Sequence, residues 1–121
     1  GTAQCDDKET SNAFYTEILG LDIMGGGKVS TYIGHAESPW YVVVLPARER
    51  NYLRPINRYT LKVATAPDVL DAYDRLGKLS SGVTKLCDLK EDSGEASFIF
   101  SDLDHNWWEI TSTDEPNRSP D

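Results

Sequence analysis

Histidine and cysteine are scarce in this sequence. Its 121 residues include two of each, His35 and His105, and Cys5 and Cys87. A zinc or iron site needs several His, Cys or carboxylate side chains that converge on one point, so the scarcity works against such a centre. Two cysteines among strand-like residues make no disulfide framework. We expect both to be free thiols and the protein to be cytoplasmic.

Positive charge and long apolar stretches are also in short supply. The 12 Lys and Arg residues face 20 Asp and Glu residues, which leaves a formal net charge of −8. Because phosphate binding needs clustered basic residues, we expect no nucleic-acid partner and no binding to an anionic membrane surface. No apolar run approaches the roughly 20 residues of a membrane-spanning helix, and no basic-plus-apolar signal segment opens the sequence.

The sequence does contain a strand and helix pattern that occurs twice. Each copy predicts a strand, a helix and three further strands, an order that can form two packed sheets with a groove between them. Segments that alternate or cluster apolar residues predict strands at 2–5, 21–24, 29–34 and 40–45, and again at 58–63, 83–89, 95–101 and 107–111.

Capping residues mark the two predicted helices. The first helix begins after Thr10 or Ser11, either of which can accept hydrogen bonds from free N–H groups of the first turn, and it ends at Gly20. Before the second helix, Thr65 and Asp68 have the spacing of a capping box. Both helices carry apolar side chains at helical spacing, which predicts that one face of each packs on a sheet.

Segments rich in glycine or polar residues predict the breaks. Gly25–Gly27 ends a strand, and Lys90–Gly94 forms a turn. The glycine run is not followed by the Lys-Ser/Thr of a phosphate loop. We therefore predict a single domain made of module one (1–45), a connector (46–57) and module two (58–112), followed by a polar tail (113–121).

Two stretches resemble a known superfamily. "FYTEILGL" at Phe14–Leu21 is similar to the helix-to-strand segment of the vicinal oxygen chelate fold, and "SDLDHNWWEI" at Ser101–Ile110 is similar to its final turn and strand. This superfamily includes glyoxalase I, bleomycin-resistance proteins, fosfomycin-resistance enzymes and extradiol dioxygenases. The resemblance covers roughly residues 1–112. It implies an α+β fold of two βαβββ modules that form curved mixed sheets around a groove, with the helices on the outer faces, and it implies a homodimer.

The resemblance also indicates where a metal would bind. Metal-using members hold the ion with His or Gln on the first strand of each module and Glu on the last. Carried onto this sequence, the second-module pair falls at Arg58 and Glu109, and the first-module Glu falls near Val43. The first-module His would precede Gly1. Arginine has no lone pair to offer and valine has no ligand atom, which leaves Glu109 as the one recognisable ligand.

Alternation along the strands predicts which side chains face the groove. Trp107 and Glu109 share one face of the last strand, and Arg58, Thr60 and Lys62 share one face of a strand that the fold places beside it. A buried carboxylate needs a counter-charge, so we expect Glu109 to pair with Arg58 or Lys62. Aromatic faces suit a planar or apolar ligand. The predicted ligand-binding residues are Trp107, Glu109, Arg58, Thr60, Lys62, Trp40 and Tyr41.

Three functions fit these observations. The favoured hypothesis is a small-molecule-binding protein of the glyoxalase/bleomycin-resistance type, which holds an aromatic or amphipathic ligand without a metal or other cofactor. The alternative is a metal-dependent enzyme of the glyoxalase, lyase or dioxygenase type. In that enzyme Glu109 is a ligand of Zn, Ni, Mn or Fe, and the ion acts as a Lewis acid. The third is metal-free catalysis with Glu109 as general base.

Overall fold

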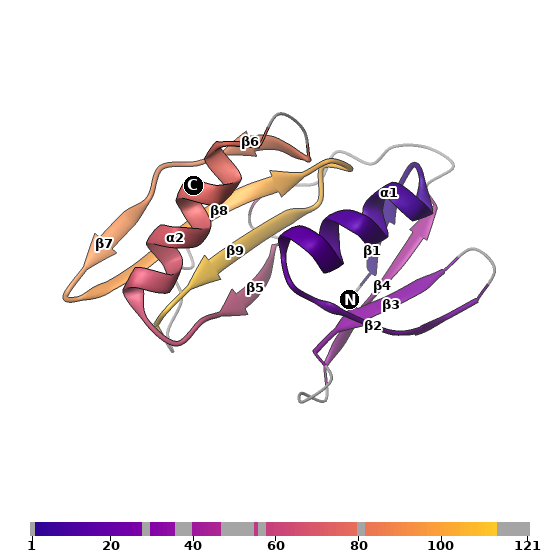
Figure 1. Cartoon of the computed structure of the whole chain (residues 1–121), viewed down its shortest axis with the longest axis horizontal. Helices are drawn as coiled ribbons and strands as arrows, with labels where there is room; N and C mark the ends of the chain where they lie inside the picture. The colour runs from indigo at the N-terminus through magenta and orange to yellow at the C-terminus, as the bar shows by residue number, and fades with distance from the viewer. Residues whose placement is uncertain are drawn as a thin grey trace. The chain divides into compact units, whose positions relative to one another are not determined.

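Each half of the chain forms one mixed sheet with a helix against it (Figure 1). The computed structural model describes residues 2–27, 30–35, 40–46, 55, 58–79 and 82–113. These residues belong to two units, Gly1–Asn51 and Tyr52–Asp121. The unit boundary falls in the predicted connector, 46–57, most of which lies outside the described residues, as does the tail after 113. The α+β class is confirmed, and the groove shared by both modules stays a prediction.

The described residues of the first unit form four strands. Its elements are β1 (Thr2–Cys5), α1 (Lys8–Ala13), the π-helical turn η1 (Phe14–Ile18), β2 (Asp22–Gly26), β3 (Thr31–Gly34) and β4 (Tyr41–Pro46). The sheet order is β1-β4-β3-β2, in which β1 runs parallel to β4 and the other neighbours are antiparallel. This is the predicted βαβββ module.

The first helix begins earlier than predicted. Asp7, rather than Thr10 or Ser11, is the N-cap residue, and its carboxylate accepts a hydrogen bond from the Thr10 backbone N–H at 3.2 Å. Aspartate caps a helix as well as serine does, so the polar run before Thr10 hid the start. Gly20 does end the helical segment, with a φ of 70° that favours glycine.

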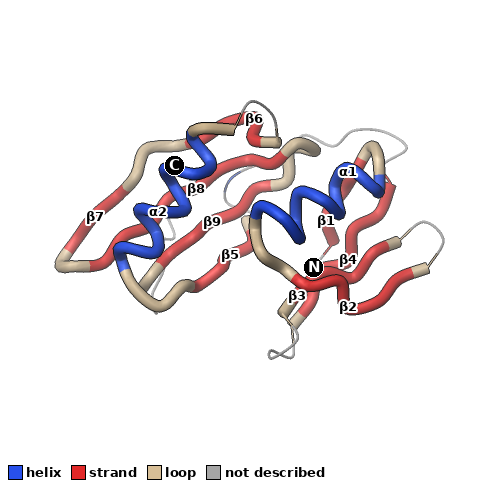
Figure 2. Tube along the Cα trace, viewed as in Figure 1, coloured by secondary structure: helices blue, strands red, loops and turns tan. Residues whose placement is uncertain are grey.

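In the second unit, the part of the chain that the structure describes forms five strands and a longer helix. Its elements are β5 (Tyr59–Lys62), α2 (Ala66–Gly77), β6 (Val83–Leu86), β7 (Lys90–Asp92), β8 (Glu95–Asp102) and β9 (Trp107–Thr111). The sheet order is β5-β9-β8-β6, and β7 also pairs with β8. Figure 2 shows α2 lying across this sheet. The predicted capping box of Thr65 and Asp68 is confirmed.

Three predicted breaks were misplaced. Residues Lys90–Asp92 form strand β7, so the turn is confined to Ser93 and Gly94. The preceding strand ends at Leu86 instead of Leu89. Strand β2 continues through Gly26, with a register shift after Ile23 that accommodates the glycines. All of β7 and β2 is solvent-exposed, so neither strand carries the apolar alternation by which a half-buried strand is recognised.

One face of the second sheet packs under α2, as alternation predicted. Trp108 and Ile110 of β9 are buried and pair in register with Phe100 and Phe98 of β8. The Phe98 ring meets Tyr73 of α2 edge to face, with ring centroids 5.1 Å apart. This apolar layer orients the strand. The side chain between Trp108 and Ile110, that of Glu109, therefore points to the opposite face of the sheet.

The turn before β9 is organised by a buried carboxylate. The Asp102 side chain, which is not exposed, accepts hydrogen bonds from the backbone N–H groups of Asp104 and Asn106 at 2.9 and 3.0 Å. It also accepts one from the indole N–H of Trp108 at 2.9 Å. These bonds tie the turn to the first residues of β9 and set where the strand begins.

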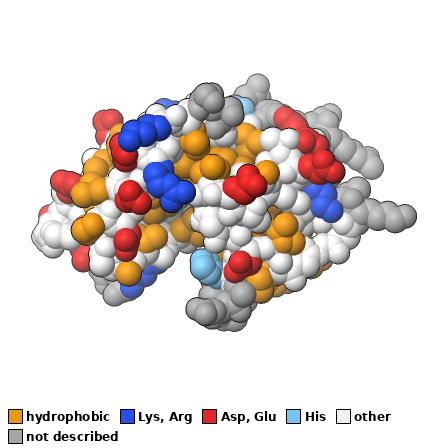
Figure 3. Space-filling model, in the orientation of Figure 1, with side chains coloured by type: hydrophobic (Ala, Val, Ile, Leu, Met, Phe, Trp, Pro, Cys, Tyr) orange, Lys and Arg blue, Asp and Glu red, His pale blue; other side chains and the backbone are white. Residues whose placement is uncertain are grey.

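The surface carries the charge that the composition predicts. Acidic side chains are spread over the face shown in Figure 3. Among the described residues, no helix is both long and apolar enough to span a membrane.

His105 occupies a backbone position that favours glycine. Its φ is 65°, in the left-handed region, and its side chain is exposed. We expect His105→Gly to raise the free energy of unfolding by about 0.5–1 kcal/mol, because relief of about 1–2 kcal/mol of backbone strain exceeds the added entropy of the unfolded chain. Urea unfolding measures the change. The control is His35→Gly, at an exposed position without positive φ, which should be neutral or slightly destabilising. A destabilised His105→Gly variant would contradict the strain.

Candidate functional site

The candidate site lies on the face of the second sheet that points away from α2. Strands β5 and β9 run parallel with Thr60 opposite Glu109, so these two side chains share a face. Strand β8 brings Ile99 opposite Glu109 from the other side. Glu109 therefore stands at the centre of three adjacent strands.

Glu109 and Arg58 form a buried ion pair. The Arg58 Nε–H donates to Glu109 Oε1 at 3.0 Å, and the two side chains are 6% and 1% exposed. Arg58 Nη1 donates to the backbone carbonyl of Pro55 at 3.1 Å. The Thr60 hydroxyl donates to the same Glu109 oxygen at 3.3 Å. The expected counter-charge is thus Arg58, and it reaches the carboxylate from the position just before the neighbouring strand β5.

The two oxygens of the Glu109 carboxylate differ in their partners. Oε1 accepts both hydrogen bonds, whereas Oε2 is buried and accepts none from the described residues. A buried charged oxygen without a donor costs on the order of 1–3 kcal/mol or more. Among the described residues of this site, Oε2 is therefore the hydrogen-bond acceptor that the fold leaves unsatisfied.

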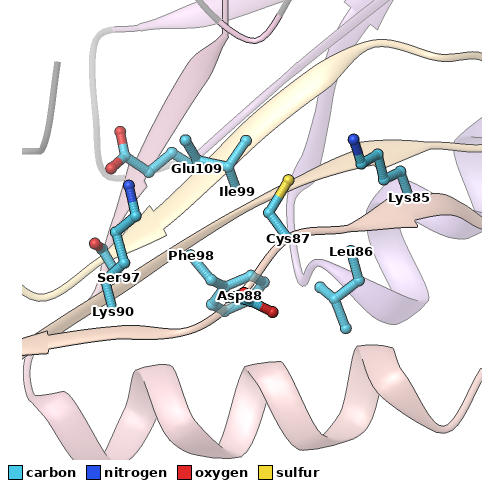
Figure 4. Close-up of a pocket in the computed structure, with 9 residues that line it drawn as sticks. All are labelled: Lys85, Leu86, Cys87, Asp88, Lys90, Ser97, Phe98, Ile99 and Glu109. Carbon is cyan, nitrogen blue, oxygen red and sulfur yellow. The ribbon is translucent and has the colours of Figure 1, made fainter. Parts of the chain in front are cut away.

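A pocket of about 400 Å³ opens beside Glu109. Figure 4 shows Lys85, Cys87, Ile99 and Glu109 on one side of the sheet, with Leu86 and Phe98 turned toward the helix on the other. The remaining lining residues are Asp88, Lys90 and Ser97. Apart from Glu109, sequence reasoning missed this lining, because only the pairing of β6 and β7 with β8 brings Lys85 and Lys90 beside Ser101 and Ser97.

The other second-unit residues predicted for the site have different surroundings. Trp107 is half-buried and pairs in register with Ser101, and Lys62 is exposed and pairs with Thr111. Neither residue lines the pocket. Their direct contact with a ligand stays a prediction.

Trp40 and Tyr41 belong to the first unit. Both are exposed, and the Tyr41 ring stacks on Tyr32 with centroids 5.4 Å apart. The paired tyrosines form an aromatic surface on β3 and β4. A role for Trp40 and Tyr41 in the Glu109 site also stays a prediction.

Solved structures define the fold. The chain is 17% identical to a member of the glyoxalase/bleomycin resistance protein/dioxygenase superfamily from Sphaerobacter thermophilus, with a TM-score of 0.70 over 93% of this chain and 94% of that one. It is 14% identical to lactoylglutathione lyase from Agrobacterium tumefaciens (TM-score 0.66; 93% and 90% covered). It is 16% identical to the fosfomycin resistance protein FosX from Listeria monocytogenes (TM-score 0.68; 97% and 90% covered).

The sequence matches no protein-family model and no curated protein. The structural likeness nevertheless confirms the resemblance at the level of fold, since the chain has the vicinal oxygen chelate fold of this superfamily. Proteins of one fold run different reactions or none. The chemistry must therefore be argued from the side chains of this chain.

Those side chains do not fit a resident divalent metal. The described residues contain no group of three or more His, Cys, Asp or Glu side chains that could hold an ion. The first-unit register places Val43 opposite Thr2, as the second places Glu109 opposite Thr60, so valine stands where the first-module Glu was expected. A cation bound at Glu109 would also be repelled by Arg58, which is already within hydrogen-bond distance of that carboxylate.

The ion pair predicts that the single variant has a much lower free energy of unfolding than the double variant. Arg58→Met should lower the free energy of unfolding by about 3–5 kcal/mol, because it leaves a buried carboxylate without its counter-charge. Arg58→Met combined with Glu109→Met should regain most of that loss, since no charge remains buried. Chemical unfolding of the two variants measures both values. Equal stability of the wild type and Arg58→Met would show that the pair contributes nothing.

Proposed function

We propose that this chain is a small-molecule-binding protein whose ligand occupies the pocket beside Glu109 without the help of a metal. The Arg58–Glu109 ion pair carries this proposal. In metal-using proteins of this fold, as the resemblance implies, the corresponding two positions supply ligands to the ion. Here one of them supplies a guanidinium, which cannot ligate and neutralises the other.

The ion pair leaves one oxygen of the Glu109 carboxylate without a hydrogen-bond partner among the described residues. Thr60 and Arg58 hold the Glu109 carboxylate in one orientation, with Oε2 unpartnered at the edge of a pocket whose size suits a small organic molecule. An orientation fixed before the ligand arrives reduces the entropy lost on binding. This arrangement supports a function in which Glu109 accepts a hydrogen bond from the ligand instead of binding a metal.

One observation favours the alternative of a metal-dependent enzyme of the glyoxalase, lyase or dioxygenase type. The unpartnered Oε2 has the chemistry of a ligand for Zn, Ni, Mn or Fe. One of the structurally similar proteins is named a lactoylglutathione lyase. The donor set of the described residues weighs more heavily, since a catalytic ion needs about three protein ligands.

Metal analysis distinguishes the two functions. Protein purified without chelator should contain well below one Zn, Ni, Mn or Fe per chain by mass spectrometry of the elements. Arg58→His, which replaces the guanidinium with an imidazole, should take up more zinc than the wild type does. Glu109→Gln is the control for ions bound elsewhere. Stoichiometric metal in the wild type that is lost in Glu109→Gln would overturn the metal-free function.

We also propose a cytoplasmic homodimer, on the basis of the family resemblance. Light scattering coupled to size exclusion should give twice the mass of one chain. Tyr41→Lys places a charge on the exposed aromatic surface and distinguishes an interface there from one elsewhere. A monomer at all accessible concentrations would contradict the dimer and leave the binding function intact.

A further inference from the structure

The Glu109 pocket combines one unpartnered acceptor with two cations. The acceptor is Oε2 of Glu109, on a side chain that is 1% exposed. The cations are the ammonium groups of Lys85 and Lys90. Both lysines are exposed, and the pairing of Lys85 with Ser101 and of Lys90 with Ser97 puts them on the same face of the sheet as Glu109. Figure 4 shows the two lysine side chains extending to the side on which Glu109 lies.

The charge of this pocket differs from that of the whole chain. The chain carries a formal charge of −8. In the pocket, Lys85 and Lys90 face two carboxylates, Asp88 and Glu109, and Arg58 already neutralises the second. Lys85 and Lys90 therefore supply cations on the Glu109 face of the sheet, which favours an anionic ligand over a neutral or cationic one.

Ile99 provides an apolar surface beside the acceptor and the cations. It lies directly opposite Glu109 on β8, on the face of the sheet that also carries Lys85 and Lys90. A ligand body that covers this surface gains from burial of apolar area. A flat ring or a short carbon chain meets that condition.

We propose that the ligand is a small organic acid that also carries a hydroxyl group. The hydroxyl donates a hydrogen bond to Glu109 Oε2, the acid group pairs with Lys85 or Lys90, and the carbon body covers Ile99. This assignment rests on the proposed function, because an ion at Glu109 would occupy the same oxygen. It goes further by requiring two particular groups on one ligand.

Hydroxybenzoates test the two requirements separately. The probes are 3- and 4-hydroxybenzoate, with benzoate lacking the hydroxyl and the methyl esters lacking the charge. NMR titration of labelled protein gives each Kd. The better hydroxybenzoate should bind about tenfold more tightly than benzoate, since one buried hydrogen bond to a charged group contributes about 1.4 kcal/mol or more. Esterification should weaken binding to a similar extent.

Cys87 reports whether a probe occupies this pocket. Its thiol lines the pocket and is partly exposed, whereas Cys5 is 1% exposed and serves as the internal control. A bound hydroxybenzoate should slow alkylation of Cys87 by N-ethylmaleimide. Lys85→Ala with Lys90→Ala should abolish the advantage of the acid over its ester, and both positions are exposed, so the variant is expected to fold. Lys78→Ala, an exposed lysine on the helix side that does not line the pocket, should bind like the wild type.

The outcomes distinguish this ligand assignment from the proposed metal-free binding function on which it rests. Hydroxyl-dependent and charge-dependent binding that protects Cys87 and requires the two lysines supports the assignment. Protection of Cys87 by benzoate, hydroxybenzoate and ester alike overturns the assignment and retains a metal-free binding pocket. Failure of every probe to protect Cys87 overturns the assignment, whereas stoichiometric metal held by Glu109 overturns the binding function itself.

Discussion

The Glu109 carboxylate lies in the middle of a buried strand, and Arg58, just before the start of the adjacent strand β5, balances its charge. Either group alone would carry a desolvation cost of several kcal/mol, and each makes burial of the other tolerable. The pairing requires β5 and β9 to be neighbours in one particular register, since a shift by one residue would turn one of the two side chains to the opposite face. The site, its polarity and its poor fit to a metal all depend on this contact.

Two of the three carboxylates in the segment from Asp102 to Ile110, Asp102 and Glu109, have different roles because their partners differ. The Asp102 oxygens accept hydrogen bonds from the backbone and from the Trp108 indole, so this carboxylate stabilises the turn. Glu109 retains one oxygen without a partner. The apolar layer under α2 links the two roles, because burying Trp108 beside Phe100 directs Glu109 to the other face. Within one short segment, the fold thus uses the Asp102 carboxylate for the turn and leaves one oxygen of Glu109 unsatisfied.

Much of the fold was predictable from local patterns. The capping box at Thr65, the left-handed Gly20 and the alternation along β9 each depend on residues near one another in the sequence. A cationic partner for Glu109, either Arg58 or Lys62, was also predictable once the resemblance made their strands neighbours. The cap at Asp7 was missed because several adjacent polar residues could fill that role. Strand β7 was missed because it is exposed, so no buried face imposes an apolar pattern on it.

The sequence by itself determined the α+β class, the repeated module and the need for a cation beside Glu109, because helix caps and strand alternation are local and a buried carboxylate demands a cation. Only the tertiary structure decided that Arg58 is that cation, that Glu109 Oε2 is unpartnered, and that Lys85 and Lys90 line the same pocket. These facts depend on strand order and register, which join residues far apart in the chain. Alternation tells which side chains share a face of one strand, and pairing tells which of them meet across the sheet.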